Sequence, residues 1–246
     1  MLLSTKITVD EPEQRSNDRL LNFRLLFYGL SSIHWIIAAV VLLPIDFSVD
    51  EDPKIQIYST LRFKFITTWF NLMLGLYLPL CLYCDWKEKC NQENLPHVVV
   101  WRKVRDVLFT SIMFPTIMFA DILFWRLYYK DMSLIAPVAL FAYVPDWSQH
   151  SLHTFTLVSA LVDLCVVFRQ RPKSLKPRFM LMSCFFLTYT LVVWQSYING
   201  IMVYSLLGTF TGFQIVLLIV MSYLEMSFYF ILQWHVIDYI WGKPKS

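Results

Sequence analysis

Residues 206–233 read LLGTFTGFQIVLLIVMSYLEMSFYFILQ and hold a single charged residue, Glu225. An apolar run of about 18 or more residues with few charges is typical of a membrane-spanning helix, because a helix needs about 20 residues to cross the hydrocarbon core. A water-soluble protein of this size can bury its apolar residues without such long runs. The stretch therefore predicts an integral membrane protein.

The composition of the whole chain agrees with this class. Charged residues make up 16% of the chain, against about 25% in an ordinary soluble domain. The net charge of +3 is too small to indicate a nucleic-acid partner. Because no repeat, low-complexity tract or linker is visible, residues 1–246 are interpreted as one domain. The expected fold is all-α, a polytopic bundle of about six transmembrane helices.

Five further runs complete the predicted set of spans. The six are Phe23–Leu43, Phe65–Cys84, Val107–Leu127, Ser151–Val167, Phe179–Tyr197 and Leu206–Gln233. The fourth span is short and contains Asp163. The apolar stretch Met132–Val144 before it is interpreted as an interfacial or re-entrant segment that packs under the fourth helix.

Lys and Arg are distributed unevenly between the connections. With six spans, sixteen of the 21 lie on one side, in residues 1–24, 87–105 and 169–178 and in the tail. Cytoplasmic loops carry the excess of Lys and Arg in membrane proteins. We therefore expect the polar arm (1–22) and the tail (234–246) to be cytosolic. The sequence leaves the endoplasmic reticulum and the plasma membrane both open as the location.

Two histidines open the fourth span, in the stretch DWSQHSLHT (146–154). His150 and His153 are three residues apart, which places them on one face of a helix, and Thr156 and Asp163 continue that face. Polar groups within a span are costly and are therefore functional candidates, so this face is expected to point into the bundle. The histidines could instead only hydrogen-bond between helices. A metal site is a further alternative, but no glutamate accompanies the H-x-x-H spacing.

A second polar cluster opens the second span, in the stretch RFKFITTWFN (62–71). Thr67 and Thr68 could simply hydrogen-bond to their own helix backbone. However, the second and fourth spans run in the same direction, so these threonines and His153 are expected at a similar depth. An alcohol needs an adjacent base to act as a nucleophile at neutral pH, and histidine is the usual one.

These stretches resemble elements of a known family. KFITTWFNL (64–72) resembles the K-[FY]-[LM]-T-x-x-[ND]-L element of the androgen-induced and androgen-dependent TFPI-regulating protein family, and PDWSQHSLHT (145–154) resembles its P-x-W-x-x-H-x-x-H-T element. Shorter matches extend the resemblance from about Arg62 to Trp241. Members of this family are multi-span hydrolases with a threonine nucleophile and a histidine, and they cleave fatty acid esters of hydroxy fatty acids. The resemblance implies Thr67 as nucleophile and His153 as its partner.

The match also has departures. One extra residue separates Thr67 from Asn71, and counting back from Asn71 would select Thr68 instead. Ser205 stands where the family's W-V-Y-P element ends in proline. Asp121, inside the third span, is not part of the family pattern. These differences bear on substrate preference and on whether activity is retained.

Four residues receive supporting or substrate-binding roles. His150, Asn71 and Thr68 flank the two catalytic candidates, and His150, Asn71 or backbone N–H groups could donate to an oxyanion. Asp121 is expected on the bundle side of its helix, in the half that holds the histidine. There it would either orient the histidine or only bond a neighbouring helix. We expect no metal and no cofactor.

The resulting prediction is a membrane-embedded lipid ester hydrolase whose substrate enters laterally from the bilayer. The alternative is a non-catalytic multi-span protein that binds lipid or acts as a scaffold. A transporter is less favoured, because such proteins show internal repeats or paired broken helices. The expected partners are the lipid ester and the surrounding membrane lipids; the sequence does not indicate a protein partner.

Overall fold

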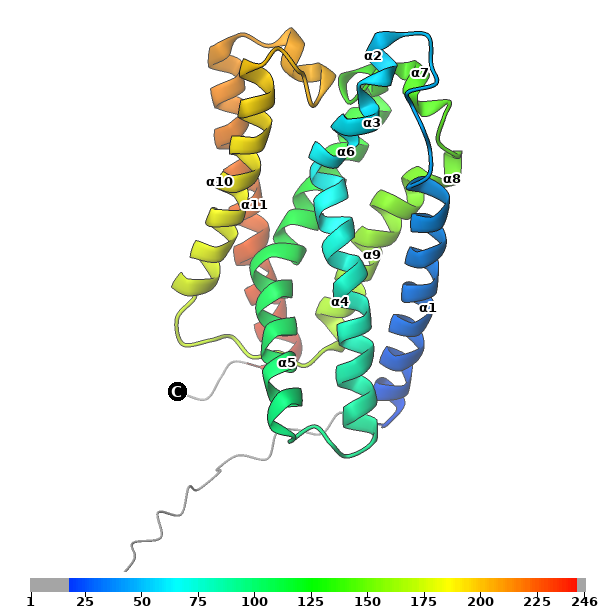
Figure 1. Cartoon of the computed structure of the whole chain (residues 1–246). Coiled ribbons are helices and arrows are strands. Elements are labelled where there is room, and N and C mark those ends of the chain that lie inside the picture. The colour runs from blue at the N-terminus through cyan, green and yellow to red at the C-terminus, as the bar shows by residue number, and fades with distance from the viewer. Residues whose placement is uncertain (1–17, 243–246) are drawn as a thin grey trace, which may run out of the picture.

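The computed structural model describes residues 18–242, and this part of the chain contains helices but no strand. The principal helices are α1 (Asp18–Leu42), α4 (Ile66–Lys89), α5 (Pro96–Leu108), α6 (Phe114–Asp131), α9 (Phe155–Val166), α10 (Lys176–Ile198) and α11 (Gly212–Trp241). They lie roughly side by side along one axis (Figure 1). The predicted all-α membrane bundle is confirmed.

Five helices of the described part are long and apolar enough to cross a membrane: α1, α4, α10, α11 and the continuous helix Pro96–Leu134 that contains α5 and α6. The predicted fourth span is not among them. It consists of α8 (Asp146–Gln149), a π-helical turn η4 (His150–Thr154) and α9, which has only 12 residues. This segment crosses the bundle obliquely (Figure 1), and its polar side chains are largely buried inside.

The predicted boundaries of the first and last spans differ from the structure. The last span was expected to start at Leu206, but Ser205–Thr209 forms a 3-10 turn, and α11 begins after Thr211, whose side chain and that of Gln214 form a capping box. That helix continues to Trp241, so most of the expected tail is helical. At the other terminus α1 already begins at Asp18; residues 1–17 and 243–246 lie outside the described part.

The outer faces of the long helices are apolar, as a lipid environment requires. Leu26, Ile33 and Val40 of α1 and Leu187 of α10 are all more than half exposed. A water-soluble monomer rarely exposes apolar surface on this scale. By contrast, every residue of α6 from Phe114 to Asp121 is buried, so α6 is the central helix of the bundle.

A π-helical turn, η2 (Phe109–Met113), joins α5 to α6 immediately before Pro115. Proline has no N–H, and its ring clashes with the carbonyl four residues earlier, here that of Ser111. The wider π turn relieves this conflict without ending the helix. The chain therefore passes through the centre of the bundle as one helix and carries Asp121 into its interior.

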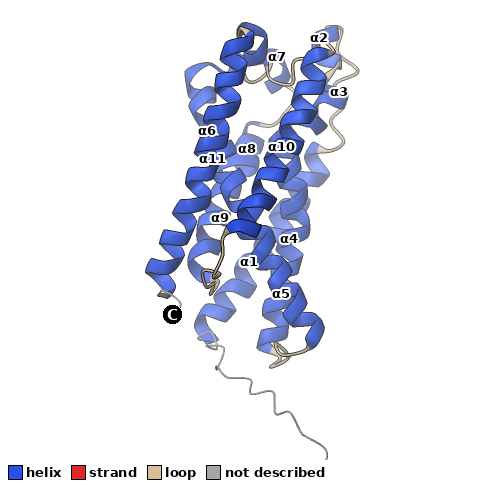
Figure 2. Ribbon diagram, turned by 90° about the vertical axis from the view of Figure 1, so that its left-hand side faces the viewer, coloured by secondary structure: helices blue, strands red, loops and turns tan. Residues whose placement is uncertain are grey.

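One end of the bundle is closed by short segments that we call the cap, residues 44–65, 132–145 and 199–211 (Figure 2). The cap contains α2 (Pro53–Gln56), α3 (Tyr58–Leu61), η1 (Arg62–Lys64), η3 (Met132–Leu134), α7 (Val138–Phe141) and η5 (Ser205–Thr209). It has its own small core, which includes Ile55, Tyr58, Ile135 and Val203. The stretch 132–144 thus packs over the bundle end as part of the cap, rather than under the fourth helix.

A hydrogen bond also joins two loops of the cap. The Tyr143 hydroxyl donates to Asp50 at 2.5 Å. Together with the N–H of Asp52, this bond holds the pKa of the Asp50 carboxyl below its ordinary value. The contact ties the loop after α1 to the loop after α7.

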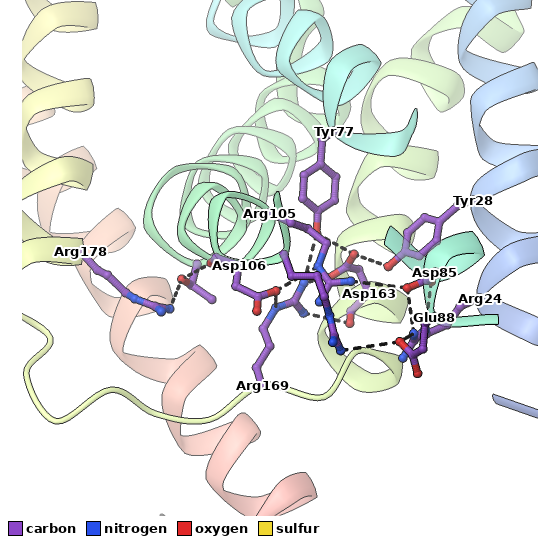
Figure 3. Close-up of polar contacts among 12 residues, drawn as sticks. Arg24, Tyr28, Tyr77, Asp85, Glu88, Arg105, Asp106, Asp163, Arg169 and Arg178 are labelled. Carbon is purple, nitrogen blue, oxygen red and sulfur yellow. Dashed lines mark hydrogen bonds and ion pairs between the residues drawn. The ribbon is translucent and has the colours of Figure 1, made fainter. Parts of the chain in front are cut away.

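The opposite end, where α1 begins and α11 ends, is held by buried ion pairs (Figure 3). Arg24 of α1 donates to Asp85 of α4 through Nε at 2.9 Å and Nη2 at 2.8 Å, and Nη2 also lies 2.8 Å from Glu88. Arg105 of α5 approaches the same Asp85 carboxylate at 3.5 Å. One carboxylate therefore connects three helices.

A second group of buried contacts surrounds Asp163 of α9 at the same end of the bundle (Figure 3). Arg169 lies 2.5 Å from its Oδ1, while the hydroxyls of Tyr28 and Tyr77 donate to Oδ2 at 2.6 and 2.8 Å. All four side chains are buried. Because a buried charge without its partner is strongly destabilising, these contacts fix α9 against α1 and α4.

This cluster changes how the charge pattern is understood. The sequence count placed three buried arginines among the cations that face the cytosol. In the structure, almost no surface of Arg24, Arg105 or Arg169 is exposed, and each forms an ion pair. Of the basic segments, the described stretches 87–105 and 169–178 lie at one end of the bundle, the end that holds both the start of α1 and the end of α11 (Figure 1).

Candidate functional site

A cavity of about 390 Å³ lies beneath the cap, in the half of the bundle that the cap closes. Its walls come from α1, α4, α6, α10 and α11, and they are almost entirely apolar, with residues such as Leu72, Phe119 and Ile219. Ligand pockets commonly measure about 300–1,000 Å³ and place a few polar groups on an apolar lining. Here Thr67, Thr68, Asn71, Gln149 and His153 are among those polar groups.

His153 is held by a carboxylate from the central helix. Its Nδ1 lies 2.8 Å from Oδ1 of Asp121, and both side chains are buried. When the carboxylate is ionised it can only accept hydrogen bonds, and in that state Nδ1 carries the proton and Nε2 keeps its lone pair. No described residue hydrogen-bonds Nε2. With Asp121 ionised, the imidazole has the tautomer that a general base requires.

Two further contacts fix the orientation of this pair. The rings of Phe124 and His153 are stacked, with centroids 3.5 Å apart and planes inclined by 5°. The Thr156 hydroxyl donates to Oδ2 of Asp121 at 2.6 Å and also lies 2.9 Å from the carbonyl of Leu152. Both carboxylate oxygens are thus engaged, and the imidazole cannot tilt away from the carboxylate without losing the stacking.

The two adjacent threonines at the start of α4 have different environments. The Thr68 hydroxyl donates to the carbonyl of Arg62 at 2.6 Å. The Thr67 hydroxyl has no hydrogen-bond partner among the described residues, although it lines the same cavity. The hydroxyl of Thr67 is the one that remains available to a ligand or a base. Thr67 and His153 share the cavity without a direct hydrogen bond between them.

Asn71 joins the two helices that carry these groups. Its side-chain amide donates to the carbonyl of Thr67 at 2.9 Å and to the carbonyl of Leu152 at 3.4 Å. Leu152 directly precedes His153, so one side chain connects the threonine turn of α4 to the π turn that holds the histidine. The Trp35 indole of α1 donates to the backbone carbonyl of Asn71 at 2.8 Å.

Two N–H groups in the first turn of α4, those of Ile66 and Thr67, do not bond to a backbone carbonyl of the described part. The first four N–H groups of a helix have no partner within it, and the N–H of Ile66 donates to the hydroxyl of Tyr204 at 3.2 Å. Tyr204 in turn lies 2.8 Å from the hydroxyl of Tyr189. No described group accepts a hydrogen bond from the N–H of Thr67. Sequence reasoning missed Tyr189 altogether, and Tyr204 appeared only within a short family match.

His150 lies outside this arrangement. It is exposed, its Nδ1 lies 3.1 Å from the Thr154 hydroxyl, and its ring packs near Trp125. The prediction that His150 and His153 share an inward face is wrong, because η4 is a π turn. A π turn closes i→i+5 hydrogen bonds, so residues three apart are rotated further from each other than in an α-helix. Thr156 and Asp163, which lie after the turn, do face inward.

Comparison with known proteins identifies the family of this chain. A sequence profile of FAR-17a/AIG1-like proteins matches residues 25–236. The chain belongs to the FAR-17a/AIG1-like family. The androgen-dependent TFPI-regulating protein of Mesocricetus auratus is 25% identical over 85% of this chain and 89% of its own length. The androgen-induced gene 1 protein of Homo sapiens is 25% identical over 80% of this chain and 84% of its own length. No solved structure matches the chain significantly.

Membership of the FAR-17a/AIG1-like family bears out the resemblance found in the sequence, while the roles of individual residues stay predictions. Asp121 lies on the bundle side, and it contacts both His153 and the neighbouring helix through Thr156. Both alternatives for Asp121 therefore have a contact to support them. No group of three or more His, Cys, Asp or Glu side chains in the described part is arranged to hold a metal.

Proposed function

We propose that this chain is a membrane-embedded hydrolase of lipid esters, with Thr67 as nucleophile and His153 as general base. The observation that carries the proposal is the combination of one unpaired hydroxyl and one oriented imidazole on a single apolar cavity. Residues that serve only to join helices would have both groups engaged with the protein. The family resemblance of the two sequence elements supports fatty acid esters of hydroxy fatty acids as the substrate.

The reaction would proceed by acyl transfer to threonine. Nε2 of His153 takes the proton of the Thr67 hydroxyl as its oxygen attacks the ester carbonyl. The protonated imidazole is stabilised by Asp121 and then donates the proton to the departing alkoxide, which leaves as the hydroxy fatty acid. Water, deprotonated by the same nitrogen, then hydrolyses the acyl-threonine and releases the second fatty acid.

The tetrahedral intermediates need hydrogen-bond donors for their oxyanion. The N–H of Thr67 is a candidate donor, because it lies at the N-terminus of α4 and has no partner in the described part. The positive end of the helix dipole favours negative charge at the same place. Asn71 is less suited to this role, because its amide already bridges the carbonyls of Thr67 and Leu152.

The alternative is a non-catalytic protein that binds lipid in the same cavity. A fluorophosphonate probe distinguishes the two. We expect the purified protein to be labelled on Thr67 and to hydrolyse a palmitic acid ester of hydroxystearic acid, with both activities lost in Thr67→Ala. Lipid binding without labelling or turnover would favour the alternative. We further propose residence in the endoplasmic reticulum or plasma membrane with cytosolic termini, from the charge bias.

A further inference from the structure

The lining of the cavity contains one charged side chain, Arg62, at the junction of the cap and α4. The rest of the lining is apolar or neutral, and none of its residues is acidic. A cation at the edge of an apolar cavity is costly unless an anion or other acceptors compensate it. The contacts of Arg62 therefore show whether the protein itself supplies that compensation.

The guanidinium of Arg62 is held in place but is not neutralised. Its Nη1 donates to the carbonyl of Ile45 at 2.6 Å, and its central carbon lies 5.6 Å from the ring centroid of Phe47 and 5.1 Å from that of Phe63. Its Nε is buried and has no hydrogen-bond partner. No described carboxylate lies within 4.0 Å of it.

The electrostatic effect of Arg62 on Asp46 is small. Arg62 lowers the pKa of Asp46, but less than the bonds from Ser48 do. Asp46 accepts from the N–H of Ser48 at 2.9 Å and is exposed on its loop.

Other arginines of the described bundle contrast with this one. Arg24, Arg105 and Arg169 are paired with carboxylates inside the bundle, and Arg126 on its surface pairs with Glu225 at 3.0 Å. Arg62 is the one that combines a place in the cavity lining with a buried, unpaired nitrogen. A guanidinium that is held in place and has no carboxylate partner among the described residues is suited to bind the carboxylate of a ligand.

The position of Arg62 relative to Thr67 limits where that carboxylate would be. The two residues are five apart in sequence, and five residues span at most about 17 Å even when fully extended. The Thr68 hydroxyl, bonded to the Arg62 carbonyl at 2.6 Å, draws the two segments closer. A carboxylate that lies a number of methylene groups from a reacting ester could therefore reach Arg62 while the ester is at Thr67.

We propose that Arg62 binds the free carboxylate of an amphiphilic ester and thereby selects acidic lipids. This inference rests on the proposed function for the ester chemistry, but the binding of a fatty carboxylate can be tested without it. Lys64 is not an equivalent candidate, since its ammonium donates to Ser196 at 2.9 Å and it does not line the cavity.

The test compares full-length wild type with Arg62→Gln on two substrates, a palmitic acid ester of hydroxystearic acid and the methyl ester of the same compound. We expect the wild type to prefer the free acid over the methyl ester by at least tenfold in kcat/KM, and we expect Arg62→Gln to lose that preference. Arg126→Gln, which removes a positive charge outside the cavity, should keep the preference. An unchanged preference in Arg62→Gln would overturn the proposal.

A second measurement is independent of turnover. Photocrosslinking with a diazirine-labelled palmitic acid, competed by unlabelled palmitate, should be at least tenfold weaker in Arg62→Gln than in wild type. Arg62→Lys should fall between the two, which also covers the case in which the glutamine variant does not fold. If crosslinking of palmitate depends on Arg62 but the wild type hydrolyses neither ester, the proposed function fails and this inference stands. Equal crosslinking in all variants, or competition by lysophosphatidate but not by palmitate, would refute it.

Discussion

Nδ1 of His153 and Oδ1 of Asp121 lie 2.8 Å apart on two different helices, both buried, and the imidazole is stacked on Phe124. This contact gives each of two polar residues that are costly within a membrane a partner, and in the proposed mechanism it orients the base. In a serine triad the carboxylate has the same two effects, since it fixes the tautomer and stabilises the imidazolium.

Asp121→Asn should lower kcat for ester hydrolysis by about 10²–10⁴-fold, because an amide can donate to Nδ1 and so favour the wrong tautomer. A merely structural role would instead lower the amount of folded protein without altering its pH dependence. The measurement is kcat as a function of pH, on folded protein purified by size-exclusion chromatography. Asp121→Glu should recover part of the activity, and an unaltered kcat in the asparagine variant would exclude the orienting role.

Thr67→Ala should abolish turnover and probe labelling, while Thr68→Ala should retain most of both. The reason is that the Thr68 hydroxyl is engaged with the Arg62 carbonyl and the Thr67 hydroxyl is not. Mass spectrometry of the labelled peptide identifies the modified residue. If labelling were instead lost in Thr68→Ala and retained in Thr67→Ala, α4 would have to rotate on substrate binding. The family register would then count back from Asn71.

His153→Ala should reduce kcat/KM by about 10³-fold or more, whereas His150→Ala should retain activity within about tenfold. His153 faces the cavity, but His150 is exposed and contacts Thr154 and Trp125. Both variants are compared at equal amounts of folded protein. Comparable losses in the two variants would contradict the separation that the π turn creates.

Asp163→Asn should destabilise the bundle by about 3–5 kcal/mol, because it removes the nearest counter-charge of buried Arg169 and leaves only Asp106, 3.5 Å from its Nε. The measurement is the thermal unfolding midpoint in detergent. Glu225→Gln serves as the control, since its partner Arg126 is more than half exposed and such surface pairs contribute only about 0–1 kcal/mol. Equal decreases of the unfolding midpoint in the two variants would show that the buried ion pairs are not the main source of stability at this end of the bundle.

Tags fused to the two termini should be accessible from the same side of the membrane, and the charge bias predicts that this side is the cytosol. The structure supports the first half, because α1 begins and α11 ends at one end of the bundle. Protease digestion of sealed and selectively permeabilised cells measures both. Digestion of one tag with protection of the other would contradict an even number of crossings.

The sequence by itself determined the membrane class, the approximate helices and a short set of polar residues. Hydropathy suffices for this, because every helix that faces lipid must be apolar over its length. Thr67 and His153 were reached by combining that pattern with a family resemblance. What hydropathy could not supply was the rotation of each helix about its own axis.

Tertiary structure decided which of these polar groups meet. It gave His153 a carboxylate, engaged Thr68 elsewhere, turned His150 outward at η4 and buried three arginines that the charge count had assigned to loops. The physical reason is that a side chain's direction depends on turn geometry and on packing between helices distant in sequence. Arg62 appears in the sequence as one more basic residue before a span. Only the folded cavity shows that no carboxylate of residues 18–242 pairs with its charge.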